Sequence, residues 1–178
     1  MVIRKAVIGD ERGIASVQVQ SWKETYKGII KDEILDNMEV DKREDMWKKI
    51  LEENVPNRFT YIAVNEDNQI VGFASGGENR TKAYSYDAEL YTLYLLAENH
   101  ARGIGKELFL HTARDLINVG FQSMLVWVLK DNKTRGFYEK FSSKLVGEEF
   151  IDGLEVFEVA YGWESLENII GKNNLRNK

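Results

Sequence analysis

The sequence contains no cysteine and only two histidines, His100 and His111, in 178 residues. Without thiols the chain can form no disulfide, no thiolate metal site and no cysteine nucleophile, and two histidines are too few for a histidine-rich metal site. We therefore expect no metal centre. The longest stretch without a charged residue, residues 116–129, is too short and too polar to span a bilayer, so we expect no membrane partner.

A surplus of basic residues is also missing. Lys and Arg number 24 against 29 Asp and Glu, which gives a formal net charge of −5. This charge repels a phosphate backbone and mildly favours cationic partners, so we expect no nucleic acid partner. The first residues, MVIRK, lack the apolar core of a secretion signal, and we expect a cytoplasmic protein.

Length and composition are typical of one globular domain. Hydrophobic residues make up 43% of the chain and charged residues 30%, which are ordinary values for a domain with a substantial core. No internal repeat, low-complexity tract or linker divides the sequence. We expect a single α/β domain over residues 1–178, with a polar tail from about residue 165.

Periodicity and turn residues predict the outer elements. Three helices are expected in the N-terminal third, beginning near Asp10, Asp32 and Asp41, whose side chains are suited to cap a first turn. A short helix is expected after Glu164. Between residues 152 and 153 the pair Asp-Gly is a signal for a two-residue hairpin turn. Extended patterns predict strands over residues 2–7, 59–65, 70–75, 144–151 and 154–161.

Residues 89–140 form the central unit of the chain. Residues 89–96 are bulky and apolar without Gly or Pro, which predicts a buried strand, and residues 124–129 predict a second one. Between them lie a glycine loop and, over residues 107–119, apolar side chains at helical spacing. A right-handed crossover of this kind makes the two strands parallel and places the helix on one face of the sheet.

The glycine loop, residues 100–106, reads HARGIGK. A helix that starts here presents free backbone N–H groups and the positive end of its dipole, and Gly103 and Gly105 let an anion approach the main chain. Arg102 and Lys106 add full positive charges. The loop therefore predicts a phosphate or pyrophosphate site, although the two glycines alone would also suit a tight strand-to-helix turn.

A second motif follows the second strand, where residues 131–140 read DNKTRGFYEK. His100-x-x-Gly103-x-Gly105 resembles the Gln/Arg-x-x-Gly-x-Gly/Ala loop of the GNAT superfamily of acyl-CoA-dependent N-acetyltransferases. Asn132 followed by FYEK at residues 137–140 resembles the Asn…Phe-Tyr-Glu-Lys helix of the same family, at matching spacing. Further stretches, at residues 21–28, 71–77 and 88–94, resemble a bacterial single-domain subgroup.

Two departures from the family pattern stand out. His100 occupies the position where the family usually has Gln or Arg, and Phe141-Ser142-Ser143 replaces the usual Leu-Gly-Phe or Leu-Gly-Gly. The second change removes a glycine that would end the helix in the left-handed conformation.

The resemblance covers nearly the full chain and implies the GNAT fold. This is a mixed, mostly antiparallel central sheet with one parallel strand-helix-strand crossover and helices on both faces. In this family the strand before the glycine loop splays from the next parallel strand, and the pantetheine arm of the coenzyme lies in the gap. Acetyl-CoA is thus the expected co-substrate. The positions carried over for its binding are Leu93, Tyr94, Leu95, His100, Ala101, Arg102, Gly103, Ile104, Gly105, Lys106, Asn132, Phe137 and Lys140.

Acetyl transfer needs an uncharged amine, a polarised thioester carbonyl and a proton for the departing thiolate. The resemblance implies that Tyr138 supplies this proton. A phenol with a pKa of about 10 can hydrogen-bond to a thiolate whose acid has a pKa of about 8.5. Glu89 is the candidate general base, directly or through water. A main-chain N–H near Leu95 would polarise the carbonyl. Tyr138 could instead be a core aromatic, and Glu89 a strand-edge carboxylate satisfied by a neighbour.

Trp22, Glu24 and Tyr26 are expected to line the amine pocket, because substrates of the family enter against the N-terminal helices. Three function classes stay open. The first is an acetyl-CoA-dependent N-acetyltransferase that acts on a small-molecule or peptide amine by direct transfer in a ternary complex. The second is a catalytically silent acyl-CoA sensor. The third is a dinucleotide-binding enzyme, which Asp131 would suit but Leu108 at the third glycine position does not. The edge of the hairpin over residues 144–161 would suit a homodimer.

Overall fold

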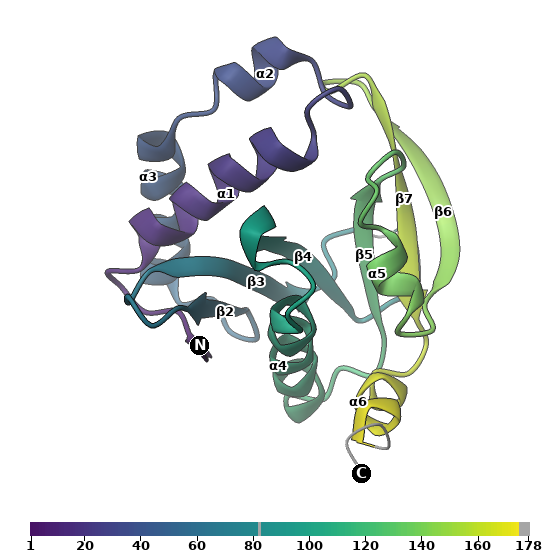
Figure 1. The fold of residues 1–178 in the computed structure, drawn as a ribbon. Coiled ribbons are helices and arrows are strands. Elements are labelled where there is room, and N and C mark those ends of the chain that lie inside the picture. Colours follow the sequence, from purple (N-terminus) through teal and green to yellow (C-terminus); the bar gives the residue numbers. More distant parts are fainter. Residues whose placement is uncertain (82, 175–178) are drawn as a thin grey trace.

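The computed structural model describes residues 1–81 and 83–174. A seven-stranded sheet in the order β1-β2-β3-β4-β5-β7-β6 forms the centre of the fold (Figure 1). Neighbouring strands are antiparallel except for β4 and β5, as the sequence predicts. The strands are β1 Val2–Lys5, β2 Phe59–Val64, β3 Ile70–Glu78, β4 Ala88–Leu95, β5 Met124–Leu129, β6 Lys144–Ile151 and β7 Val156–Trp163.

Helices cover both faces of the sheet. On one face α1 packs against β3 and β4 and is flanked by α2 and α3, and on the other α4 packs against β2, β3 and β4 beside α6 (Figure 1). The apolar stripe of α1 explains its place, because Ile14 and Val17 are fully buried with Phe73 of β3. The helices are α1 Glu11–Thr25, α2 Asp32–Asp36, α3 Val40–Glu53, α4 Ile104–Asn118, α5 Gly136–Glu139 and α6 Glu167–Asn174, with a 3₁₀ turn η1 at Ala97–Asn99.

The parallel pair β4 and β5 is hydrogen-bonded over a short stretch only. Its register runs from Ala88 opposite Met124 to Leu90 opposite Val126, and the strands then diverge although β4 continues to Leu95 and β5 to Leu129. A bulge sits at the point of divergence, since Gly76 of β3 pairs with Leu90 and Ser75 with Thr92, which leaves one extra residue in β4. The splayed strands expected from the family resemblance are therefore present.

The turn between β6 and β7 differs from the prediction. Ile151 pairs with Val156, so four residues rather than two connect the strands, and β7 starts two residues later than predicted. Glu155, not Gly153, has the left-handed backbone (φ 55°), and its N–H donates to Ile151 O at 2.8 Å. The Asp-Gly signal located the hairpin but gave the wrong turn.

The C-terminal prediction is met in part. A short helix, α6, follows Glu164 as expected and packs against α4. The end of the predicted polar tail, residues 175–178, lies outside the described residues. Within residues 1–81 and 83–174, no helix combines the length and apolar character needed to cross a membrane.

Candidate active site

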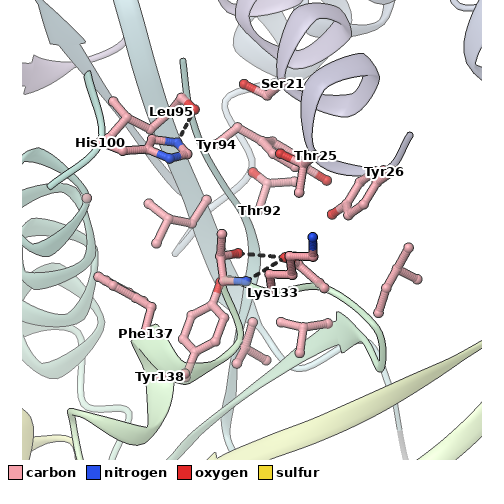
Figure 2. Close-up of a pocket in the computed structure, with 18 of the residues that line it drawn as sticks. Ser21, Thr25, Tyr26, Thr92, Tyr94, Leu95, His100, Lys133, Phe137 and Tyr138 are labelled. Atoms are coloured by element: carbon pink, nitrogen blue, oxygen red, sulfur yellow. Dashed lines mark hydrogen bonds between the residues drawn. The ribbon is translucent and has the colours of Figure 1, made fainter. Parts of the chain in front are cut away.

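A cavity of about 810 Å³ opens where β4 and β5 diverge. Its walls come from the end of α1, residues 92–95 of β4, residues 126–129 of β5, the glycine loop with the start of α4, and the segment around α5. In Figure 2, Ser21 and Thr25 of α1 and Tyr26, which follows the helix, lie on one wall, and Phe137 and Tyr138 lie on the opposite one. The cavity thus joins the two sequence motifs with the N-terminal helix.

The start of α4 has the geometry of an anion site. Gly103 is the N-cap with φ 80° and ψ −6°, a left-handed conformation that glycine adopts without strain. The N–H of Glu107 donates to Gly103 O (3.1 Å) and is the first N–H of α4 to bond within the helix. The N–H groups of residues 104–106 therefore have no acceptor within the helix. A Cβ built on Gly103 would meet nothing within 4 Å, so the main chain is open to a ligand. These donors and the helix dipole favour a phosphate.

Backbone groups of β4 face the gap. Leu96 N donates to Val71 O of β3 at 2.9 Å. Because successive residues of a strand direct their N–H and C=O groups to opposite sides, those of Leu93 and Leu95 point away from β3, toward the unpaired side of β4. His100 Nε2 lies 2.9 Å from Leu95 O (Figure 2). The imidazole therefore ties the glycine loop to the free edge of β4, and the N–H of Leu95 stays directed at the gap.

Tyr138 lies on α5 and lines the cavity, although its side chain is only 7% exposed. A turn places it there: Asn132 Oδ1 accepts hydrogen bonds from the N–H (2.9 Å) and hydroxyl (2.8 Å) of Thr134 just before the helix. Burial raises the pKa of Tyr138 above its ordinary value, and the neighbouring Tyr94 raises it further. The hydroxyl therefore keeps its proton at neutral pH and can act as a donor.

The α1 wall carries both aromatic and hydroxyl groups. Trp22 and Tyr26 line the cavity and make an edge-to-face contact with ring centroids 5.2 Å apart. Ser21 Oγ and Thr92 Oγ1 are buried and have no hydrogen-bond partner among the described residues. Sequence reasoning named Trp22 and Tyr26 but missed Ser21 and Thr25, whose helical spacing places them on the same side of α1.

Most of the predicted site residues meet in this one cavity. The exceptions are Arg102, Glu24 and Glu89, which are not among its lining residues. Those that line it are Trp22, Tyr26, Leu93, Tyr94, Leu95, His100, Ala101, Gly103, Ile104, Gly105, Lys106, Asn132, Phe137, Tyr138 and Lys140.

Glu89 lies at the paired base of β4 and β5, opposite Leu125. Its side chain is buried, 4% exposed, and its carboxylate accepts from the backbone N–H of Arg80 at 3.1 Å and from Arg80 Nε at 3.2 Å, with a further contact to Arg80 Nη2. The structure thus places Glu89 in an ion pair that holds the loop before β4, and its role as general base stays a prediction.

Arg102 and Glu24 also point elsewhere. Arg102 borders a second hollow, which includes Met1, Asn65 and Glu107. Glu24 Oε2 accepts from Ala97 N at 3.2 Å, so this carboxylate links α1 to η1. Their proposed contacts with coenzyme and amine stay predictions.

Sequence reasoning also missed part of the cavity. The segment over residues 126–129 was predicted as a strand but not assigned to the site, and Ile151, Leu154 and Glu158 come from the closing hairpin, far along the chain. No local motif marks Glu158. Its place in the cavity follows from the pairing of β7 with β5, where Glu158 stands opposite Leu129.

Comparisons of the sequence with known proteins all point to acetyltransferases. The sequence profile of the acetyltransferase (GNAT) family matches residues 22–142, more than half of the chain. An uncharacterized N-acetyltransferase of Bacillus subtilis is 36% identical over 93% of this chain and 94% of its own length. A spermidine N(1)-acetyltransferase of Thermoplasma acidophilum is 28% identical over 84% of this chain and 93% of its own length.

A solved structure is similar in fold over nearly the whole chain. The crystal structure of the PaiA N-acetyltransferase from Thermoplasma acidophilum in complex with coenzyme A superimposes with a TM-score of 0.70 at 26% sequence identity. The match covers 91% of this chain and 98% of that one. The sheet with its single parallel pair is thus shared with a structure that holds coenzyme A.

Proposed function

This chain belongs to the acetyltransferase (GNAT) family, and from that premise we propose that it moves an acetyl group from acetyl-CoA to a primary amine of a small molecule or peptide. Acetyl-CoA is the co-substrate that the family and the coenzyme A complex of a similar structure support. The observation that carries the proposal is the cavity between the splayed strands, where the anion site, the free edge of β4 and Tyr138 face one space.

The coenzyme would be held mainly by the main chain. The N–H groups of residues 104–106 would bind the diphosphate, with Lys106 adding positive charge. The free edge of β4 at Leu93 would bond the pantetheine amides in the gap that β5 leaves open. Phe137 would flank the coenzyme near Gly105, since a Cβ at Gly105 would lie 3.8 Å from its ring.

The chemical step is a direct transfer. The amine nitrogen attacks the thioester carbonyl carbon, the carbon–sulfur bond breaks, and the sulfur leaves with the bonding electrons. The Leu95 N–H is directed at the gap and would stabilise the negative charge that develops on the carbonyl oxygen. The Tyr138 hydroxyl would donate a hydrogen bond to the departing sulfur. Because its pKa lies above that of a thiol, the proton is shared with the thiolate rather than fully transferred, and the proton lost by the amine completes the thiol.

In this proposal the proton lost by the amine passes to solvent water. Glu89, the base predicted from the sequence, is engaged by Arg80 and lies outside the cavity lining. It would therefore receive the proton only through water. The hydroxyl groups of Ser21, Thr25 and Thr92 in the cavity lining would hold water beside the reacting amine.

A thiol-release assay tests the proposed function. Purified protein with acetyl-CoA and a panel of polyamines, amino sugars, amino acids and peptides should release coenzyme A with at least one amine, and the acetylated product should be detected by mass spectrometry. Polyamines stand first in the panel because a relative carries the name spermidine N(1)-acetyltransferase. Acetyl-CoA binding without turnover for any amine would instead favour an acyl-CoA sensor.

A further inference from the structure

Glu158 is the only acidic residue among those that line the cavity within the described part of the chain. It lies on β7 and is half-buried, and its carboxylate makes neither a hydrogen bond nor an ion pair with any described residue. The lysines of the lining, Lys106, Lys133 and Lys140, do not pair with it. An unpaired, partly desolvated carboxylate in a site is costly unless a cation joins it.

The surroundings of Glu158 are negative rather than positive. Its cross-strand neighbour on β6 is Glu149, and Glu89 on β4 adds a further negative charge. Burial first, and then these two carboxylates, raise the pKa of Glu158. The β7 side of the cavity, at Glu158, is therefore opposite in charge to the start of α4, where Lys106 and the helix N-terminus lie.

Two buried hydroxyl groups without hydrogen-bond partners are a second, independent indication that the cavity binds a ligand. Ser21 is only 1% exposed, its Oγ has no hydrogen-bond partner, and it lines the same cavity. The buried Oγ1 of Thr92 is likewise without a partner. In Figure 2 both residues lie by Tyr94, across the cavity from Phe137. A substrate with several N–H donors would satisfy these oxygen atoms.

We propose that Glu158 binds a second, non-reacting ammonium group of the substrate, so that the site selects diamines and polyamines over monoamines. This inference rests on the proposed acetyltransferase function. A carboxylate that held the reacting nitrogen would favour its protonated form, which cannot attack a carbonyl. A carboxylate that holds a second ammonium orients the substrate without that cost, and the aromatic rings of Trp22, Tyr26 and Trp127 in the lining suit a cation as well.

The test compares the wild type with Glu158→Gln on matched probes: 1,4-diaminobutane, spermidine and butylamine. Binding is measured calorimetrically to the coenzyme A-bound protein, and thiol release gives kcat and KM. We expect Glu158→Gln to weaken diamine binding and raise the diamine KM by about tenfold or more, the range for a hydrogen-bonded charge. Values of kcat for the diamine, and both constants for butylamine and acetyl-CoA, should change little. Glu158→Asp should recover part of the diamine affinity.

Glu149→Gln is the matched control. It removes the same charge from the cross-strand neighbour, which does not line the cavity, and should keep the diamine preference. The inference is overturned if the wild type binds diamine no better than butylamine, or if Glu158→Gln retains the preference. It is also overturned if the mutant loses kcat equally for both amines, because Glu158 would then act on the reacting nitrogen. Glu158-dependent diamine binding without thiol release would contradict the enzyme and leave the ammonium site supported.

Discussion

Tyr138 combines two properties that are seldom found together in a core residue. Its ring packs among buried aromatics, 6.4 Å from the ring centroid of Tyr161 and 6.1 Å from that of Trp163, while its hydroxyl has no hydrogen-bond partner in the described structure. A buried phenol normally finds such a partner. The free hydroxyl in the cavity thus favours a role with a ligand over the alternative of a purely structural aromatic.

The substitution Tyr138→Phe should lower kcat by about ten- to a hundredfold, because it removes a hydrogen bond to a developing thiolate. The dissociation constant of acetyl-CoA should stay nearly the same. Tyr161→Phe is the control, since it deletes a phenol hydroxyl that donates to Glu139 Oε1 (2.8 Å) outside the cavity lining. Steady-state kinetics and calorimetry give both quantities. An unchanged kcat in Tyr138→Phe would remove the donor role.

Asp10 should make stability depend on acid pH. Burial raises the pKa of Asp10, but hydrogen bonds from Arg4 and the Val7 N–H lower it by more, so the folded-state pKa lies below the ordinary value. Its contribution is then fully present above about pH 4 and disappears as the pH falls through the folded-state pKa. Asp10→Asn should cost about 1–2 kcal/mol in urea unfolding at pH 7. A difference from wild type that stayed constant well below pH 4 would contradict this.

At the scale of residues, sequence reasoning succeeded where motifs carry the information. The glycine loop, Asn132 and Tyr138 lie in short patterns, and the structure brings them to one cavity. Glu89 and Glu158 show the limit. Glu89 lies one residue before the strands diverge, but its carboxylate is bound by Arg80. This contact depends on how the loop before β4 folds, so the sequence alone does not reveal it. The position of Glu158 depends on strand pairing far along the chain.

Among the elements, the start of α4 should tolerate a side chain at Gly103 poorly, both for coenzyme binding and for stability. Gly103→Val should weaken acetyl-CoA binding about tenfold or more, because a branched side chain blocks the approach to the N–H groups and strains the left-handed N-cap (φ 80°). The backbone strain alone should cost about 1–2 kcal/mol of stability. The affinity is measured by calorimetry and the stability by urea unfolding.

Gly120 offers a control at the other end of the same helix. It has φ 100°, open space around its Cβ position, and lies outside the cavity lining. Gly120→Val should therefore cost a similar amount of stability and leave the coenzyme affinity unchanged. Equal loss of affinity in both variants would show that the effect is general destabilisation and not a blocked phosphate site.

The β6–β7 turn gives a prediction that separates the observed turn from the two-residue turn suggested by the sequence. Gly153 lacks a positive φ and has free space around its Cβ position, so Gly153→Ala should raise the unfolding free energy by about 0.4–1 kcal/mol by restricting the unfolded chain. In a two-residue turn of the Asp-Gly type the same change would be destabilising. Urea unfolding decides between them.

Left-handed positions were the least predictable feature of the elements. Helix and strand periodicity placed the long elements, yet Ala101, Ser142 and Glu155 take positive φ values without glycine. Ser142 holds the left-handed conformation although the glycine usual in the family is absent there (φ 63°). Tertiary packing rather than local preference fixes such residues, so a single sequence does not reveal them.

For the molecule as a whole, the order of elements predicted the mixed sheet, because one crossover with a helix makes β4 and β5 parallel and the remaining hairpins are antiparallel. The family resemblance, not periodicity, predicted that the two strands part. The extra residue of β4 opposite Ser75 and Gly76 and the short parallel register give that divergence its physical basis. In the proposed function, coenzyme binding and acetyl transfer would both depend on this divergence.

A crystal structure of the protein with coenzyme A tests this central claim most directly. The account predicts the pantetheine arm between β4 and β5, the diphosphate on the N–H groups of residues 104–106, and the thiol sulfur within hydrogen-bond distance of the Tyr138 hydroxyl. Coenzyme bound in the second hollow beside Arg102, or anywhere outside the gap, would contradict it.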